Sequence, residues 1–371
     1  MSGWTNSISA QSGEHIITKL SGTVSVKRAG RSNFVPAYVG MPVSTGDIFR
    51  LDKPDSKADV SCADGSTRLV DRSPINLRCA AVAAGSKPVV PPRHDGKSVS
   101  HVRGGRGSDA FPVLVAPRMT NLLNPRPVIR WLPAKDSTAY KVSVFNDADE
   151  IWSVHVGNVT EVQYSSDPQK ALIPGKTYRV VISTGEDCEQ GSHCSSEEKM
   201  ANLGFLLLDD AEVQRVRKAE DQIRGLHLPD VPTRLLVASL YADWILPNTA
   251  DGKALTAEAI EQLEGLQNIQ EPIVMRRLAE LYLTIGLTSK AVALYVSALD
   301  LSTKAGDIEG QALAQHAIGQ IFAKTSLNNN EALQRLKAAR ALYEAAGDPD
   351  VVREIDQEIA GLSGTSTVPG F

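Results

Sequence analysis

The sequence predicts a multidomain protein whose first part is built from β-strands and whose second part is helical. Apolar residues alternate with polar ones in short runs up to about residue 200, the period-2 pattern of half-buried strands. From about residue 204 to 362 apolar residues recur every three or four positions, which is typical of amphipathic helices. A length of 371 residues exceeds the usual size of one core, so two or three domains are expected.

The first segment, residues 14–82, is expected to form a small all-β domain. Leu20, Gly22, Val24 and Val26 fall on one face of a predicted strand in the stretch LSGTVSVKRAG. Asp-Gly and Ser-Pro pairs, which favour turns, separate the short apolar runs that follow. Several short strands at close spacing predict an all-β module.

This segment resembles a known bacterial domain. The strings GTVSVKRAG, AYVGMPVSTGDIFRLD and SKADVSCADGSTRLV resemble the FecR-like domain over residues 22–77. The resemblance implies an extracytoplasmic β module. The regulator of iron-transport signalling that gave the family its name needs a transmembrane helix, and no run of about eighteen apolar residues occurs here. That regulatory role is therefore not expected.

The four cysteines form two local pairs. Sixteen residues separate Cys62 from Cys79, and five separate Cys188 from Cys194. Zinc sites usually bring thiolates in as C-x2-C or C-x4-C, so the first spacing disfavours zinc. Two disulfides are favoured, with reduced structural thiols and a metal or catalytic role as the alternatives.

The cysteines also bear on localisation. The start, MSGWTNSISAQSGEH, lacks the basic and apolar regions of a signal peptide. Either the protein is cytoplasmic or a leader has been removed. Because disulfides persist in oxidising compartments, we expect a periplasmic or secreted protein, with a cytoplasmic one as the alternative.

Residues 83–111 are rich in Gly, Pro, Ser and Arg and are expected to form a basic linker. Residues 82–130 hold eight Lys or Arg and only two acidic residues. A rival interpretation is a polyanion site, such as one for an envelope glycan. Nucleic acid is not expected as a partner, because Phe111 is the only aromatic residue of the segment. The polyanion candidates are Arg93, Lys97, Arg103 and Arg106.

Residues 112–200 are expected to form a β-sandwich. Ile129 and Trp131 alternate as the buried face of a strand does, and later runs behave similarly. The residues from Pro127 to Trp131, Trp152 and the string LIPGKTYRV resemble a bacterial fibronectin-III or Ig-like domain. The resemblance implies a spacer or interaction domain. Both tryptophans are expected in the core.

The helical region, residues 204–362, contains an internal repeat. LYVSALDLSTKAGD (294–307) and RLKAARALYEAAGD (335–348) superpose with a shift of 41 residues. Such periods indicate an α-solenoid of stacked helix pairs. Thr256 is expected to cap a helix, and residues 363–371 are expected to be a disordered tail.

The repeat resembles the tetratricopeptide repeat. Ala279, Ala291 and Ala298 stand where small residues let two helices approach, and Gly286 stands at the turn between them. The resemblance implies a concave groove that binds partner proteins. Its groove positions are Arg276, Glu280, Leu283, His316 and Gln320.

No catalytic constellation is evident in the sequence. The seven histidines are scattered without metal-ligand spacing, and no nucleophile elbow or phosphate loop occurs. Catalysis by Cys62 or Cys79 would need a positioned histidine, which no motif indicates. We expect a non-catalytic scaffold or adaptor of the bacterial envelope, without cofactor or metal. The alternatives are a glycan-binding or peptidoglycan-binding protein and a cytosolic regulator.

Overall fold

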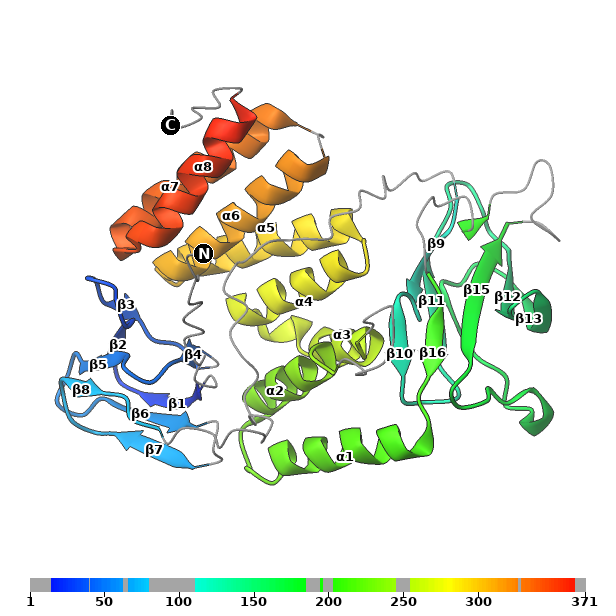
Figure 1. Cartoon of the computed structure of the whole chain (residues 1–371), viewed down its shortest axis with the longest axis horizontal. Coiled ribbons are helices and arrows are strands. Elements are labelled where there is room, and N and C mark those ends of the chain that lie inside the picture. Colours follow the sequence, from blue (N-terminus) through cyan, green and yellow to red (C-terminus); the bar gives the residue numbers. More distant parts are fainter. Residues whose placement is uncertain are drawn as a thin grey trace, which may run out of the picture.

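The computed structural model describes residues 15–39, 41–62, 66–79, 111–184, 194–195, 203–244, 254–325 and 328–363. Within these residues, a β region of several sheets, mostly antiparallel, is followed by a region of packed helices. The helices lie between two groups of strands (Figure 1). None of the described helices is both long and apolar enough to cross a membrane.

The first group of strands forms two four-stranded sheets, ordered β4-β1-β6-β7 and β3-β2-β5-β8. Ile17, Val26, Phe49 and Val60 are completely buried between them. Gly22 differs from the sequence prediction, because its φ of 70° places it in the turn between two strands. The strands are β1 (His15–Ser21), β2 (Val24–Lys27), β3 (Val35–Pro36), β4 (Pro42–Val43), β5 (Ile48–Leu51), β6 (Lys57–Ser61), β7 (Thr67–Val70) and β8 (Ile75–Asn76).

The second group forms sheets ordered β10-β16-β15-β12-β13 and β14-β11-β9 around a separate core. Trp131 is buried in this core, as expected, whereas Trp152 is only partly buried and packs against it. The strand at Phe205–Leu207 lies beyond residue 200, where the sandwich was expected to end. The strands are β9 (Val113–Ala116), β10 (Thr120–Leu122), β11 (Val128–Leu132), β12 (Tyr140–Asn146), β13 (Asp149–Val156), β14 (Glu161–Gln163), β15 (Thr177–Ser183) and β16 (Phe205–Leu207).

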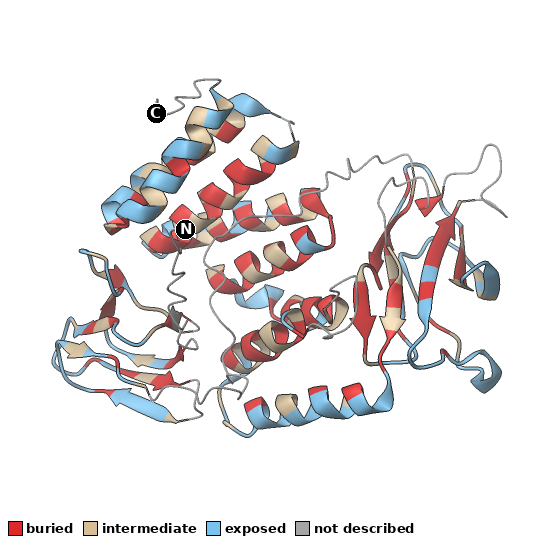
Figure 2. Cartoon of the chain, in the orientation of Figure 1, coloured by how far each residue is buried: buried red, intermediate tan, exposed pale blue. Residues whose placement is uncertain are grey.

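The helices follow one another as packed neighbours. The buried face of α1 is turned toward α2, and its other face is exposed (Figure 2). Long helices α4 to α8 pack in sequential antiparallel order. The helices are α1 (Asp210–Arg224), α2 (Asp230–Ala242), α3 (Thr256–Glu264), α4 (Pro272–Thr284), α5 (Thr288–Lys304), α6 (Ile308–Thr325), α7 (Asn329–Ala346) and α8 (Pro349–Leu362).

Three local predictions for the helices can be compared with the structure. Gly286 has a φ of 78° in the turn between α4 and α5, as expected. Ala291 and Ala298 on α5 are fully buried where helices approach, also as expected. Thr256 is wrong as a cap: it is the first residue of α3, after Leu255, and its side chain caps nothing. Leu255 is completely buried, so its packing determines where the helix begins.

Candidate functional site

Arg276, expected to line a groove, is buried against the N-terminal strands. Its Nη2 donates a hydrogen bond to the Tyr38 hydroxyl at 3.1 Å, and its Nη1 lies 3.7 Å from Asp307 Oδ2. Leu283 is buried in the helical core, whereas Glu280 is partly exposed and forms an ion pair within α4. The three groove positions on α4 therefore have three different environments.

His316 and Gln320 lie one turn apart on α6, are both buried, and both contact Glu358 of α8. Gln320 Nε2 donates to Glu358 Oε1 at 2.7 Å, and His316 Nε2 lies 3.1 Å from Glu358 Oε2. Burial disfavours the Glu358 carboxylate, but the bonds from His316 and Gln320 offset this effect and lower its pKa. The protein's own last helix thus contacts two residues that were expected to face a partner.

A cluster of charged side chains joins the N-terminal strands to the helical region, and we call it the arginine clasp. It links residues far apart in the chain: Arg28 and Glu309 are separated by 281 positions, and Arg31 and Asp348 by even more. Every arginine in the cluster forms an ion pair with at least one carboxylate of the cluster. The clasp consists of Arg28, Arg31, Tyr38, Asp47, Arg276, Asp307, Glu309 and Asp348.

Glu309 occupies the centre of the clasp. Its Oε2 accepts from Arg28 Nη2 at 3.0 Å, and its Oε1 accepts from Arg31 Nη1 at 3.3 Å. The same two arginines reach further, Arg28 to Asp47 at 3.0 Å and Arg31 to Asp348 at 2.6 Å. Arg28 is 4% exposed and Glu309 is 3% exposed, so these charges are held almost entirely out of water.

The repeated Ala-Gly-Asp sequence explains how the helical side of the clasp is built. Gly306 and Gly347 have φ of 67° and 74°, the left-handed conformation that ends a helix. The aspartate that follows each glycine caps the next helix: Asp307 Oδ1 accepts from Gly310 N, and Asp348 Oδ1 accepts from Val351 N. The other carboxylate oxygen of each aspartate lies beside an arginine.

Burial and charge act in opposite directions on the groups of the clasp. Burial disfavours the charge on Arg28, but Glu309 and Asp47 more than offset it, so its pKa is raised. Burial raises the pKa of Tyr38, although the positive charge of Arg276 opposes the shift. Burial also raises the pKa of Asp307 despite Arg276. Tyr38 therefore stays neutral at physiological pH and acts as a hydrogen-bond acceptor for Arg276.

Gly310→Ala is expected to destabilise the clasp without removing a charge. A Cβ at residue 310 would lie 2.0 Å from Asp307 Oδ2 and 2.6 Å from Arg276 Nη1, so these groups must shift. Overpacking of this kind costs about 1–3 kcal/mol in unfolding free energy. Chemical denaturation of the full chain measures the change. Gly361→Ala in α8 is the matched control: a Cβ there meets nothing within 4 Å, and the helix should be stabilised slightly.

The second group of strands also packs onto the helices through buried polar groups. Arg118, 1% exposed, donates through Nε to Ile285 O at 2.6 Å. Arg130 pairs with Glu264, which also accepts from the Tyr282 hydroxyl. Leu123 N donates to Glu258 Oε1 at 2.7 Å. Both β groups are thus fixed to the helical region by specific contacts.

Glu258 predicts a pH dependence at this second contact. Burial raises its pKa to about 7, and its Oε2 has no hydrogen-bond partner among the residues that the structure describes. Between pH 4.5 and 7 the folded protein keeps a proton that the unfolded chain has lost. Stability should therefore fall as pH rises through this window, by on the order of 2–3 kcal/mol, and stay low above it.

Denaturation of wild type and Glu258→Gln across pH 4 to 8.5 measures this effect. The variant should lose this part of the pH dependence, because an amide does not ionise. Asp300→Asn, an exposed carboxylate on α5 that pairs with Lys304 on the surface, is the control and should keep the wild-type profile. Parallel profiles for wild type and Glu258→Gln would contradict the prediction.

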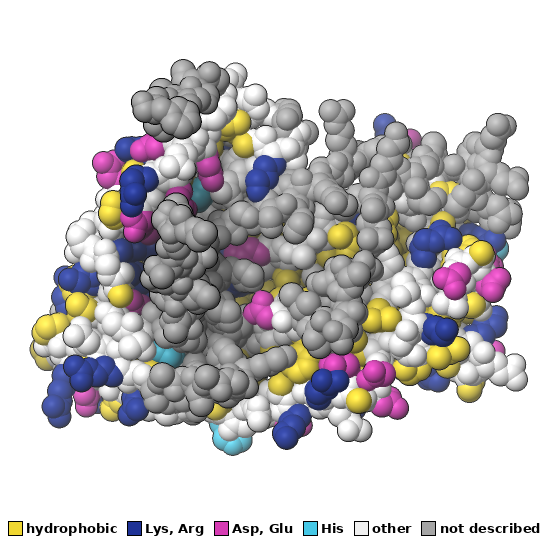
Figure 3. Space-filling view, viewed as in Figure 1, with side chains coloured by type: hydrophobic (Ala, Val, Ile, Leu, Met, Phe, Trp, Pro, Cys, Tyr) yellow, Lys and Arg dark blue, Asp and Glu magenta, His cyan; other side chains and the backbone are white. Residues whose placement is uncertain are grey.

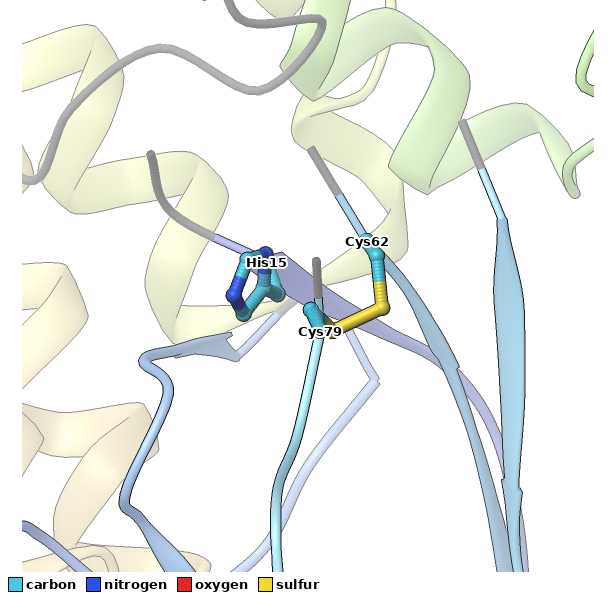
Figure 4. A group of neighbouring side chains, drawn as sticks. All are labelled: His15, Cys62 and Cys79. Carbon is cyan, nitrogen blue, oxygen red and sulfur yellow. A yellow bond between two sulfur atoms is a disulfide. The ribbon is translucent and has the colours of Figure 1, made fainter. Parts of the chain in front are cut away.

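The cysteine prediction is confirmed for one pair. Cys62 and Cys79 form a disulfide with a Cα–Cα distance of 5.7 Å. Cys194 is also disulfide-bonded, and Cys188 lies outside the described residues. No motif indicated a histidine near these sulfurs, yet His15 lies beside the Cys62–Cys79 bridge (Figure 4).

Sequence reasoning missed Arg28, Arg31 and Glu309. The one signal in the sequence was the repeated Ala-Gly-Asp at residues 305–307 and 346–348. It places a carboxylate before each of two helices, where an arginine from elsewhere in the chain could pair with it. The polyanion candidates Arg93, Lys97, Arg103 and Arg106 lie outside the described residues. On the face shown in Figure 3, described basic and acidic side chains are interspersed over the strands and helices.

No known family model matches the chain, and no curated protein shows significant similarity to it.

Proposed function

We propose that the protein is a non-catalytic scaffold of the bacterial envelope that binds partner proteins through its helical region and β surfaces. In this proposal the first strands are a FecR-like module, the second an Ig-like or fibronectin-III-like sandwich, and the helices a tetratricopeptide-type solenoid. The main support for this proposal is that ion pairs and hydrogen bonds hold both groups of strands against the same set of helices. A rigid display of several surfaces suits an adaptor.

The disulfide supports an extracytoplasmic location. The Cys62–Cys79 bridge is of the kind that persists in oxidising compartments. Mass determination of natively purified protein under non-reducing conditions tests this part. Four free thiols would favour the cytosolic regulator instead.

Fewer of the predicted groove residues are available to a partner than the repeat pattern suggests, because several already form contacts within the chain. Arg276 and Glu309 contact the N-terminal module, and His316 and Gln320 contact α8. Glu280 on α4 remains partly exposed and pairs with Arg277 of the same helix. We therefore place the partner contact near Glu280.

Site-specific photocrosslinking tests this placement in the full chain. A crosslinker at residue 280 should capture a discrete protein from envelope extract, competed by excess unlabelled protein. A crosslinker at Val296, an exposed residue on α5, is the matched control. Equal labelling from the two positions would contradict the proposal. Cosedimentation with purified cell wall, lost when the linker arginines are replaced, would favour the glycan-binding alternative.

A further inference from the structure

The cluster around His15 brings three metal-ligating side chains together from separate segments. His15 begins β1, Cys62 follows β6 and Cys79 lies after β8 (Figure 4). One imidazole nitrogen and the two sulfurs lie within 4.8 Å of one another. His15 and Cys62 are buried, and Cys79 is half-buried. The set is compact, and two of its three side chains are buried.

A disulfide does not need a histidine beside it. His15 is only 1% exposed, and burying an imidazole costs free energy unless its nitrogens form hydrogen bonds. Its Nε2 lies 3.0 Å from Thr45 Oγ1, which fixes the ring. Metal-binding histidines are oriented by a second group in the same manner.

We propose that reduction of the Cys62–Cys79 disulfide converts this cluster into a site for a thiophilic divalent cation of the zinc class. A protein dithiol gives two electrons and two protons to the bridge, becomes a disulfide itself and leaves two thiols. The cation then displaces one proton from each thiol. It is bound by two thiolates and the neutral imidazole of His15, a Cys2His set that leaves a fourth position for water.

The backbone already has the spacing that both states need. Zinc–sulfur bonds of about 2.3 Å in a tetrahedral site place two sulfurs roughly 3.8 Å apart. Side chains whose Cα atoms are 5.7 Å apart reach that separation by rotation about their Cα–Cβ bonds. The long spacing of the cysteines in sequence argued against zinc only while no third ligand was known. The strand β1 supplies that ligand.

Cobalt(II) titration of the reduced full chain tests the proposal. The parent protein carries Cys188→Ser and Cys194→Ser to remove the other thiols, and a phosphine reductant is removed anaerobically before titration. We expect one equivalent of cobalt to bind, with thiolate-to-cobalt charge-transfer absorption that zinc abolishes. The oxidised protein should show no such band.

His15→Ala should weaken cobalt binding by at least about tenfold. Replacing a residue that only supports a metal ligand already costs about tenfold in affinity, and His15 is proposed as a ligand itself. His316→Ala is the matched control, because it removes another buried histidine far from the sulfurs. A folded, reduced protein without the band would overturn the proposal, as would equal cobalt affinities for His15→Ala and His316→Ala.

Reduction alone could unfold the module, and circular dichroism detects this. In that case zinc should restore the fold, because metal binding and folding are then coupled. Failure of zinc to restore it would also overturn the proposal.

Discussion

Arg28→Ala is expected to lower the free energy of unfolding by about 3–5 kcal/mol, the usual cost of removing one partner from a buried ion pair. The substitution leaves Asp47 and Glu309 with their charges buried and one fewer cation between them. Each carboxylate then bears the cost of desolvation without this compensation. Chemical denaturation of the full chain, followed by far-UV circular dichroism, measures the loss.

Arg50→Ala is the matched control in the same module. Arg50 is 48% exposed and pairs with Asp52 on the surface, so its removal should change stability little. A double-mutant cycle of Arg28→Ala with Glu309→Ala should show strong coupling, because the two side chains are in direct contact. Equal losses for Arg28→Ala and Arg50→Ala would mean that the clasp contributes nothing beyond a surface pair.

Removal of the Cys62–Cys79 bridge by alanine at both positions is expected to cost about 3 kcal/mol. The bridge closes a loop with a sequence separation of 17, which restricts the unfolded chain. It also ties the end of β6 in one sheet to the segment after β8 in the other. Amide hydrogen exchange should therefore accelerate most in the N-terminal strands.

The measurement is made without reductant and with a chelator, so that no metal replaces the bridge. Wild-type protein whose bridge has been reduced, measured in the presence of the same chelator, should show a similar loss. An unchanged denaturation midpoint in the alanine variant would show that the fold does not depend on this bridge.

The β and helical halves could be predicted because their signals are local. Alternation predicted the burial of Trp131, and the turn at Gly286 followed from the helix-pair pattern. Local signals also misled. Gly22 continued an alternating run, but it lies in a turn with a φ of 70°. A Cβ at this position would lie 2.5 Å from Ser56 Oγ, so only glycine fits there. The strand at Phe205–Leu207 was hidden because a three-residue apolar run has no clear period.

The candidate site depends on contacts that local patterns do not encode. Arg28 and Glu309 are 281 residues apart, and each alone is typical of a solvated surface. His15 and the cysteines come from three segments whose spacing matches no metal motif. Groove positions were inferred for a partner, whereas α8 and the N-terminal module contact Gln320 and Arg276 within the chain.

The position of Arg31 has a mechanical consequence. It bridges Glu309, at the start of α6, to Asp348, at the start of α8, and so spans two successive helix-pair junctions. Helices α4 to α8 each pack mainly on their neighbours in the sequence, so the helical region can bend at each junction. Because Arg31 joins two of these junctions, we expect it to restrict bending between α6 and α8 and to couple a displacement of α8 to the first group of strands.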